Sequence, residues 1–213
     1  MTNDRDGQSL GALAPFVAAM AAIIALSNVL VQYPVQATVG GVDLADTLTW
    51  GAFTYPVAFL VTDLANRRLG ARPARRVVLV GCALAVVLSV ALASPRIAIA
   101  SGTAFLAAHM LDVSVFDRLR RGAWWRPPLV SSGLGSLLDT LLFFSLAFAP
   151  VFAALDFGGE EGSLGFPAPL LGVGPEVPLW VSLALGDLLV KALVALALLG
   201  PYGLLRGRDA VAA

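Results

Sequence analysis

The chain has 213 residues, of which 58% are hydrophobic and 13% are charged. Soluble domains carry about 25% charged residues, so roughly half of the usual charge is absent. The 14 basic and 14 acidic residues cancel, which excludes the basic surplus of a nucleic-acid-binding protein and the high net charge of a disordered chain. A single cysteine, Cys82, and a single histidine, His109, exclude an internal disulfide and metal sites that need several of these residues. The composition therefore predicts an integral membrane protein without a metal or a cofactor.

Six stretches are long and apolar enough to cross a bilayer, whose hydrocarbon core of about 30 Å needs about 20 helical residues. They are too long for the alternating segments of about 10 residues in a membrane β-barrel. The first is not a signal peptide, because its apolar run is too long and no clear cleavage site follows it. The sequence thus predicts an all-α fold, one integral membrane domain over residues 1–213. The six predicted transmembrane helices cover residues 10–33, 47–66, 76–94, 97–116, 128–152 and 178–203.

The arginines fall almost entirely on one side of these spans, and the opposite side has only Arg96. By the positive-inside rule, we expect a multi-pass membrane protein with both termini in the cytoplasm. An even number of spans requires the same arrangement. The arginines of the cytoplasmic side are Arg5, Arg67, Arg68, Arg72, Arg75, Arg76, Arg118, Arg120, Arg121, Arg126, Arg206 and Arg208. The outer loops 34–46 and 153–177 carry Asp43, Asp46, Asp156, Glu160, Glu161 and Glu176, and the second, rich in glycine and proline, is predicted to be irregular.

Three charged residues lie deep within the predicted spans: Asp139, Asp187 and Lys191. An ionisable side chain at a helix centre costs about 2.5–3.5 kcal/mol on insertion scales, so it usually faces a cavity or a partner. Asp187 and Lys191 are four residues apart and share a helix face. They form either an ion pair that only lowers the cost of insertion or part of a substrate cavity. Asp139 has no charged neighbour in its own span, and Lys191 is the only deep cation that can pair with it.

Asp63 and Asp112 lie nearer the cytoplasmic ends of the second and fourth spans. Each has a structural interpretation, because Asp63 precedes Arg67 by four residues and Asp112 can reach interfacial water. His109 is one turn from Asp112 on the same face. It is either a packing residue or a proton carrier.

Amides and aromatic residues gather near the outer ends of the first two spans. Asn28 and Gln32 are four residues apart, and they either bond across helices or present donors and acceptors to a flat polar ligand. Pro56, which permits a kink, is surrounded by Trp50, Phe53 and Tyr55. Aromatic faces beside amides and a carboxylate suit a heterocyclic base, and ordinary packing is the alternative.

Taken together, these polar residues resemble the pattern of the queuosine precursor transporter family, in order and over about residues 20–205. The spacing from Asp187 to Lys191 matches as well. The runs that carry the resemblance are Ser27-Asn28-Val29-Leu30-Val31-Gln32 with Pro34, Thr49-Trp50-Gly51-Ala52-Phe53 with Pro56, Thr62-Asp63-Leu64, Leu111-Asp112-Val113 with Val115-Phe116, Trp124-Trp125, and Asp139-Thr140 followed by Phe143-Phe144.

The resemblance implies a six-helix inner-membrane importer of 7-cyano-7-deazaguanine and 7-aminomethyl-7-deazaguanine, salvaged to make the queuosine base of tRNA. It implies facilitated or secondary uptake and no enzymatic activity. The chain agrees in lacking a G-x-x-x-x-G-K-[ST] phosphate-binding loop. The partners are then the deazapurine base and the lipid bilayer, with no nucleic acid, and a homo-oligomer is left open. The preferred precursor and the coupling ion are not readable from the sequence.

A deazaguanine offers two adjacent N–H donors that one carboxylate accepts side by side, as it accepts an arginine fork. Asp139 is the first candidate for this carboxylate and Asp187 the second. Asn28 or Gln32 would donate to the ring carbonyl, and Trp50 or Phe53 would stack on the ring. Ser136 stands where the family pattern suggests an asparagine, which puts the substrate preference in doubt. The candidate substrate-binding residues are Asn28, Gln32, Trp50, Phe53, Asp63, Asp112, Ser136, Asp139, Asp187 and Lys191.

Other classes of membrane protein compete with this interpretation. A vitamin-binding subunit of an ATP-driven importer is similarly small and six-helical. An intramembrane serine protease would use Ser131 or Ser132 with His109, but that chemistry needs the histidine in a later span than the serine. A purely structural membrane subunit does not explain three deep charged residues.

Overall fold

The computed structural model describes residues 3–155 and 164–207. Five helices of this part are long and apolar enough to cross a membrane, by length and composition, and four of them are α4, α5, α6 and α7. The fifth is the Gly11–Leu30 segment of α1. The α-helices are α1 (Asn3–Leu30), α2 (Gly51–Thr54), α3 (Val57–Leu69), α4 (Ala71–Leu92), α5 (Pro95–Leu119), α6 (Arg126–Phe148) and α7 (Leu179–Leu205).

The second predicted span, 47–66, is a broken helix rather than a continuous one. Residues 47–50 belong to a loop in which Thr49 pairs with Pro34. Pro56 separates α2 from α3 because proline has no N–H to continue the helical ladder. With 13 residues, α3 is about 20 Å long and does not cross a bilayer alone. The fold is therefore a helical membrane protein with five continuous candidate spans and one broken element, and six crossings remain a prediction.

Local sequence explains where the long helices begin. Gly70 joins α3 to α4 with φ of +91°, a conformation that residues with a Cβ rarely adopt. Ser94 caps α5, since its Oγ accepts a hydrogen bond from the backbone N–H of Ile97 at 3.3 Å. Pro95 then occupies the first turn of α5, and Pro127 and Pro128 occupy the first turn of α6, where a missing N–H costs little.

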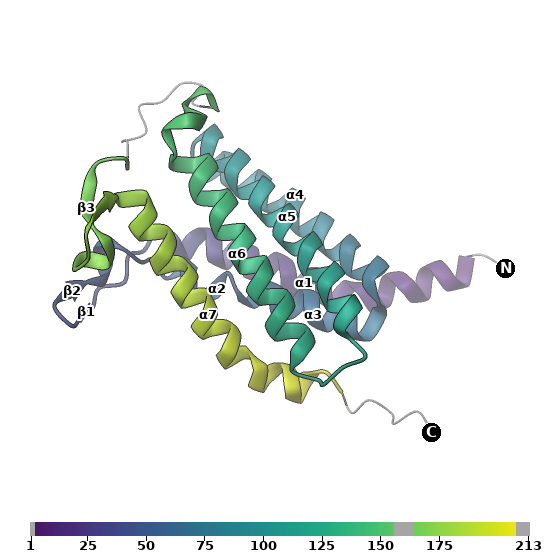
Figure 1. Cartoon of the computed structure of the whole chain (residues 1–213). Helices are drawn as coiled ribbons and strands as arrows, with labels where there is room; N and C mark the ends of the chain where they lie inside the picture. Colours follow the sequence, from purple (N-terminus) through teal and green to yellow (C-terminus); the bar gives the residue numbers. More distant parts are fainter. Residues whose placement is uncertain (1–2, 156–163, 208–213) are drawn as a thin grey trace.

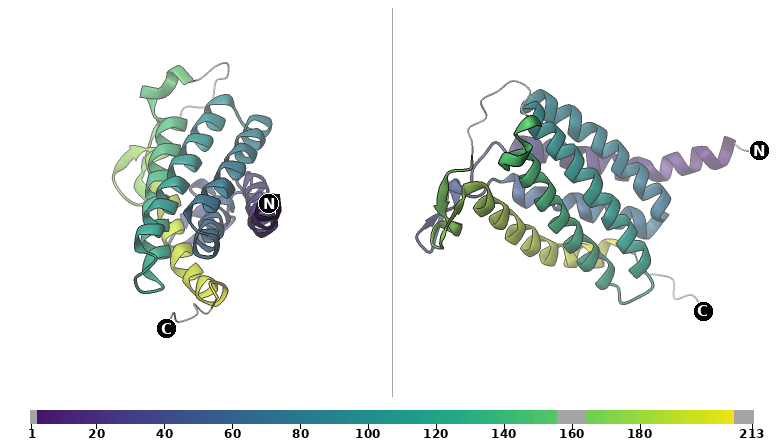
Figure 2. Two further views of the ribbon diagram at one scale, coloured as in Figure 1. Left: turned by 90° about the vertical axis from the view of Figure 1, so that its right-hand side faces the viewer. Right: turned by 45° about the horizontal axis from the view of Figure 1, so that its top comes forward.

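The helices α4, α5 and α6 lie side by side as successive antiparallel neighbours (Figures 1 and 2). Helix α1 packs on α4 and α3, and α7 packs on α6 and α2. The main core is formed where α1 meets α4 and α5. At Gly81 a Cβ would lie 2.8 Å from Met20 Cγ and 3.2 Å from Phe105 Cζ. Small residues at such crossings let membrane helices approach closely.

Two short hairpins lie together at one end of the bundle (Figure 1), which we call the hairpin end. The first pairs β1 (Thr38–Val39) with β2 (Val42–Asp43) through Gly40 and Gly41, and the second pairs β3 (Pro167–Pro169) with β4 (Glu176–Pro178). The all-α prediction thus omitted these strands. The described part of the 153–177 loop, predicted to be irregular, is ordered in η2 (Pro150–Leu155) and the second hairpin. Asp156, Glu160 and Glu161 lie outside the described residues.

The opposite end of the bundle, which we call the basic end, holds the α3–α4 turn, the α5–α6 turn and the end of α7 (Figure 1). These segments carry the arginines that the sequence assigns to one side of the membrane, apart from Arg5, which belongs to α1, and Arg208, which lies outside the described residues. Arg67 and Arg120 tie the two turns together, because each donates to the other's backbone carbonyl, at 2.7 and 3.2 Å. Arg68 similarly donates to the carbonyl of Leu205. The predicted clustering of arginines at one end is confirmed, whereas the side of the membrane that this end faces remains a prediction.

Arg96, the exception in the arginine pattern, is buried at the hairpin end, with 7% of its surface exposed. Its guanidinium donates to the carbonyls of Leu146 and Ala149 at 2.9 and 2.8 Å. These carbonyls belong to the last turn of α6, where a helix has no internal donors and its dipole favours a cation. Arg96 therefore caps the end of α6.

Candidate functional site

A cavity of about 400 Å³ lies among the helices in the half of the bundle toward the hairpin end. Its walls come from the end of α1, from α2, from the facing ends of α4 and α5, and from α6 and α7. The loop residues Thr47, Leu48 and Thr49 also line it. Cavities of about 300–1,000 Å³ are typical of small-molecule sites. Of the predicted site residues, the cavity brings together Asn28, Gln32, Asp139, Asp187 and Lys191.

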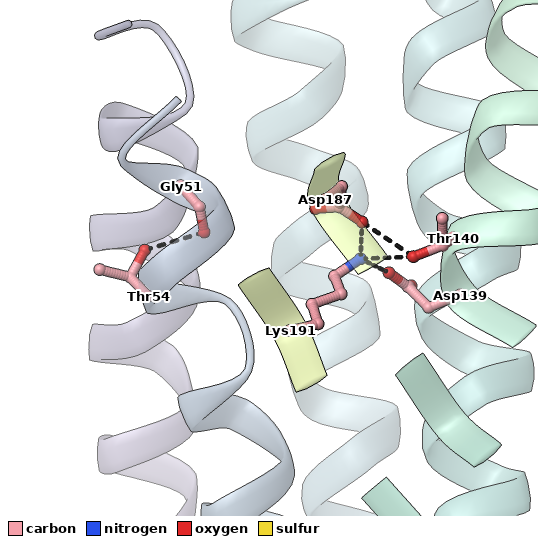
Figure 3. Close-up of polar contacts among 6 residues, drawn as sticks. All are labelled: Gly51, Thr54, Asp139, Thr140, Asp187 and Lys191. Atoms are coloured by element: carbon pink, nitrogen blue, oxygen red, sulfur yellow. Dashed lines mark hydrogen bonds and ion pairs between the residues drawn. The ribbon is translucent and has the colours of Figure 1, made fainter. Parts of the chain in front are cut away.

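Three charged side chains of this cavity, Lys191, Asp139 and Asp187, form one connected group with the hydroxyl of Thr140 (Figure 3). We call these four residues the Lys191 cluster. Lys191 Nζ lies 2.7 Å from Asp139 Oδ2 and 2.6 Å from Asp187 Oδ2. Thr140 Oγ1 lies 3.2 Å from Lys191 Nζ and donates to Asp187 Oδ2 at 2.8 Å. Both ion pairs predicted from the sequence are therefore confirmed.

Lys191 neutralises only part of the negative charge of the cluster. With both carboxylates ionised it has one excess negative charge, in an interior where an isolated charge is costly. The Asp187 side chain is 15% exposed, compared with 6% for Asp139. Lys191 engages the Oδ2 atoms of both residues, so a ligand that bonds to both oxygens of one carboxylate shares Oδ2 with Lys191. Asp187 presents more of its carboxylate to the cavity than Asp139 does.

The amides of Asn28 and Gln32 lie on the α1 wall of the cavity. Asn28 Nδ2 donates to the carbonyl of Ile24 at 2.9 Å, and Gln32 Nε2 donates to the carbonyl of Asn28 at 3.3 Å. Each amide group has two N–H donors and a carbonyl acceptor, so each retains groups for a ligand. Neither amide bonds across helices in the described structure, which leaves both available to the cavity.

The aromatic surface of the cavity agrees with the predicted one only at Tyr55. Trp50 and Phe53 do not line the cavity: Trp50 is 49% exposed and its ring contacts that of Phe53, with 5.7 Å between centroids. The rings that do line it are Tyr55 of the α2–α3 break and Phe143, Phe144 and Phe148 of α6. Lys191 Nζ also lies 5.6 Å from the centroid of the Tyr55 ring, within the range of a cation–π contact.

The remaining predicted site residues, Asp63, Asp112 and Ser136, lie outside this cavity, toward the basic end. Asp63 accepts hydrogen bonds from Ser131 Oγ and Ser132 Oγ, each at 3.2 Å. It does not pair with Arg67 among the ion pairs of the described chain. Asp112 is fully buried rather than open to interfacial water.

His109 lies between two aromatic rings. Its ring centroid is 4.2 Å from those of both Phe59 and Phe105, and its Nδ1 is 3.1 Å from Thr62 Oγ1. The packing interpretation of this histidine accounts for these contacts.

Two features of the site were missed by sequence reasoning. Thr140 enters the sequence analysis only within the family pattern, beside Asp139, although its hydroxyl bridges Lys191 and Asp187. Phe143 and Phe144 were noted only as part of a family pattern, yet they line the cavity. Both lie within one turn or so of Asp139 on α6, and that spacing was the available signal.

The geometry defines a helical membrane protein with a small-molecule cavity that holds an ion-paired carboxylate cluster in its interior. The chain belongs to the family described as "Putative vitamin uptake transporter", which matches residues 49–93 and 89–205. The resemblance to the queuosine precursor transporter family is thereby confirmed.

Two curated relatives support the same family. A "Probable queuosine precursor transporter" of Haemophilus influenzae is 37% identical over 59% of this chain and 65% of the relative. The "Queuosine precursor transporter" of Escherichia coli is 37% identical over 59% of this chain and 64% of the relative. The match thus spans less than two thirds of either relative's length. No solved structure matches the chain.

Proposed function

We propose that the chain is a transporter, not an enzyme, that imports queuosine precursors across the cell (inner) membrane. The substrates would be 7-cyano-7-deazaguanine and 7-aminomethyl-7-deazaguanine, the deazapurine bases that the family resemblance implies. The observation that carries the proposal is the Lys191 cluster, which places ion-paired carboxylates at the wall of a cavity of about 400 Å³. Both relatives named above are transporters by name.

The recognition chemistry follows from the groups at the cavity wall. The ring N1–H and the exocyclic amine of a deazaguanine point the same way, and a carboxylate accepts both. Asp187 is the better placed of the two candidates, because more of its side chain is exposed than that of Asp139. An amide N–H of Asn28 or Gln32 would donate to the ring carbonyl. Phe143, Phe144 or Tyr55 would stack on the ring, in the role the sequence suggested for Trp50 and Phe53.

The orientation rests on the arginines of the basic end. By the positive-inside rule this end faces the cytoplasm, and the hairpin end with the cavity faces outward. Both termini are then cytoplasmic. A cavity in the outer half of the bundle suits the uptake of a substrate that is present outside the cell.

The decisive experiment is complementation in cells that lack both precursor synthesis and their own transporter. With 7-cyano-7-deazaguanine supplied at low concentration, we expect the wild-type chain to restore queuosine in tRNA. Asp187→Asn should lose this activity, because an amide cannot accept two donors side by side. Asp117→Asn is the matched control, since Asp117 is exposed at the basic end and pairs only with Arg120 among the described residues.

Absence of queuosine with the wild-type chain present in the membrane would contradict the proposed substrate. Restoration by Asp187→Asn at equal expression would remove Asp187 from the site. Uptake by the purified chain alone in ATP-free proteoliposomes distinguishes a secondary transporter from the binding subunit of an ATP-driven importer, which would need its ATPase.

A further inference from the structure

A second buried polar group lies nearer the basic end and takes no part in the cavity. We call it the Asp63 cluster: Asp63 of α3, Asp112 of α5, and Ser131 and Ser132 of α6. Two contacts fix α3 against α5 on either side of the carboxylates. Thr62 Oγ1 lies 3.1 Å from His109 Nδ1, and Asn66 Nδ2 donates to the carbonyl of Val113 at 2.9 Å. Asp63 and Asp112 both lie between these two contacts along their helices, so the two carboxylates belong to the same buried layer of the bundle.

The negative charge of Asp63 and Asp112 is not neutralised by any ion pair within the described residues. Asp63 and Asp112 are 1% and 0% exposed. Asp63 receives only the two neutral serine hydroxyls, and neither carboxylate oxygen of Asp112 has a hydrogen-bond partner within residues 3–155 and 164–207. No ion pair in that part of the chain reaches either residue. Two adjacent carboxylates in an apolar interior cannot both stay ionised, so the site requires a cation.

A small cavity beside the Asp63 cluster offers the space through which a cation can reach the carboxylates. Its volume is about 20 Å³, enough for one water molecule, and Asp63, Ser132 and Ser136 contribute to its lining. Ser136 Oγ is buried and has no partner in the described structure. A lone hydroxyl that faces a water-sized space next to a carboxylate is suited to hold a water molecule that carries a proton.

The two clusters are connected along one face of α6. Ser132, Ser136 and Thr140 follow each other at intervals of four residues, so their hydroxyls lie in a row about 6 Å apart. Ser132 donates to Asp63, and Thr140 donates to Asp187. Ser136 lies between them. The row therefore runs from the Asp63 cluster toward the Lys191 cluster.

We propose that Asp63 and Asp112 together bind one proton and that movement of this proton drives the transport of substrate. The inference rests on the proposed transport function for its role, although not for the site itself. The proton is held as one carboxylic acid O–H, on either Asp63 or Asp112. On release that O–H bond breaks, and the proton passes to water at the basic end.

The other titratable groups near Asp63 and Asp112 each have contacts of their own. His109 on α5 is stacked between Phe59 and Phe105. Tyr202 of α7 lines the small cavity. Arg67 of α3 and Arg120 after α5 donate to each other's backbone. On α4, Arg75 reaches Ser114 Oγ at 3.5 Å. Asp139, Asp187 and Lys191 belong to the other cluster.

Infrared difference spectroscopy of the purified chain tests the site without any substrate. We expect the carbonyl stretch of a protonated carboxylic acid at neutral pH in the wild type, displaced in D₂O. The band should be lost in Asp63→Asn and in Asp112→Asn and be kept in the control Asp117→Asn. Absence of the band in the wild type, or its persistence in both cluster variants, would overturn the proposal. Measurement of the wild type does not depend on whether a variant folds.

Transport by proteoliposomes tests the coupling. A gradient of one pH unit supports about tenfold accumulation of a neutral substrate when one proton accompanies each molecule. We expect this accumulation in the wild type and in Asp117→Asn, and its loss in Asp63→Asn and Asp112→Asn. In these two variants, substrate exchange at equal pH should fall much less than accumulation. Equal loss of both activities, or accumulation driven by a sodium gradient and not by pH, would refute proton coupling.

The two experiments distinguish failure of the proposed substrate from failure of the proposed proton site. A wild type that exchanges no deazapurine refutes the proposed substrate, whereas the infrared band still decides whether Asp63 and Asp112 share a proton.

Discussion

The ammonium group of Lys191 lies 2.7 Å from Oδ2 of Asp139, and this ion pair joins α7 to α6 inside the bundle. The second carboxylate, Asp187, comes from one turn away on α7 itself. One lysine thus compensates two acidic side chains from two helices. The position of α7 against α6 therefore depends on these ion pairs as well as on packing.

Lys191→Met should destabilise the protein by about 3–5 kcal/mol, because it leaves two buried carboxylates without a cation. The free energy of unfolding in detergent measures this effect. Adding Asp139→Asn and Asp187→Asn to Lys191→Met should recover at least half of the loss, since the unpaired charges are then removed. If the triple variant is no more stable than Lys191→Met, the loss has a cause other than unpaired charge.

Thr140→Val keeps the shape of the side chain and removes the hydroxyl that connects Lys191 with Asp187. We expect a loss of about 1–3 kcal/mol in unfolding free energy, together with weaker binding of substrate. Thr103→Val on α5 is the control, because Thr103 is exposed and should change stability by less than about 0.5 kcal/mol. Equal effects of the two substitutions would contradict a role for the Thr140 hydroxyl.

Gly135→Ala should destabilise the bundle by about 1–3 kcal/mol through overpacking. A Cβ at Gly135 would lie 2.6 Å from Cε1 of Phe59 and 3.3 Å from the carbonyl oxygen of Ala108, where α6 meets α3 and α5. Gly133→Ala, two residues away, meets nothing within 4 Å. That control should be neutral or stabilising by up to about 1 kcal/mol, because alanine favours a helix. Thermal unfolding of the two variants side by side tests the packing at this crossing.

Arg96→Met should cost about 1.5–3 kcal/mol for each charged hydrogen bond that it removes from the end of α6. Arg118→Met is the matched control on α5, because Arg118 is exposed and its loss should be nearly neutral. Hydrogen exchange provides the local measurement: amides in the last turns of α6 should exchange faster in Arg96→Met and be unaffected in Arg118→Met. Uniform exchange in both variants would show that Arg96 does not hold this end.

The long spans were predictable from the sequence because length and apolar composition decide whether a helix can cross a membrane. The broken element was harder. Pro56 indicated a kink, but the shortening of the 47–66 segment also depends on the pairing of Thr49 with Pro34, which is distant in sequence. The hairpins were missed because their strands have only two or three residues each.

The ion pairs of the candidate site were predictable, because a buried charge needs a partner of opposite charge. The rings that line the cavity were not predictable, because they depend on how each helix is rotated about its axis. Asp139 required a deep cation, and Lys191 was the only one. In contrast, nothing in an apolar run shows which aromatic ring faces inward, so Trp50 was assigned to stacking although Phe143 and Phe144 line the cavity. The proximity of Asp63 to Asp112 was also hidden, because the sequence does not show how two helices register against each other.

The break at Pro56 has a mechanical consequence. It lies between the large cavity, which α2 lines, and Asp63, which α3 carries. Across Pro56 the backbone N–H of Ala58 donates to the carbonyl of Tyr55 at 3.0 Å, so one short turn joins α2 to α3, while Asn66 anchors α3 to α5. A tilt of α2 would therefore strain this one turn, whereas the contact of α3 with α5 lies beyond it and would stay in place.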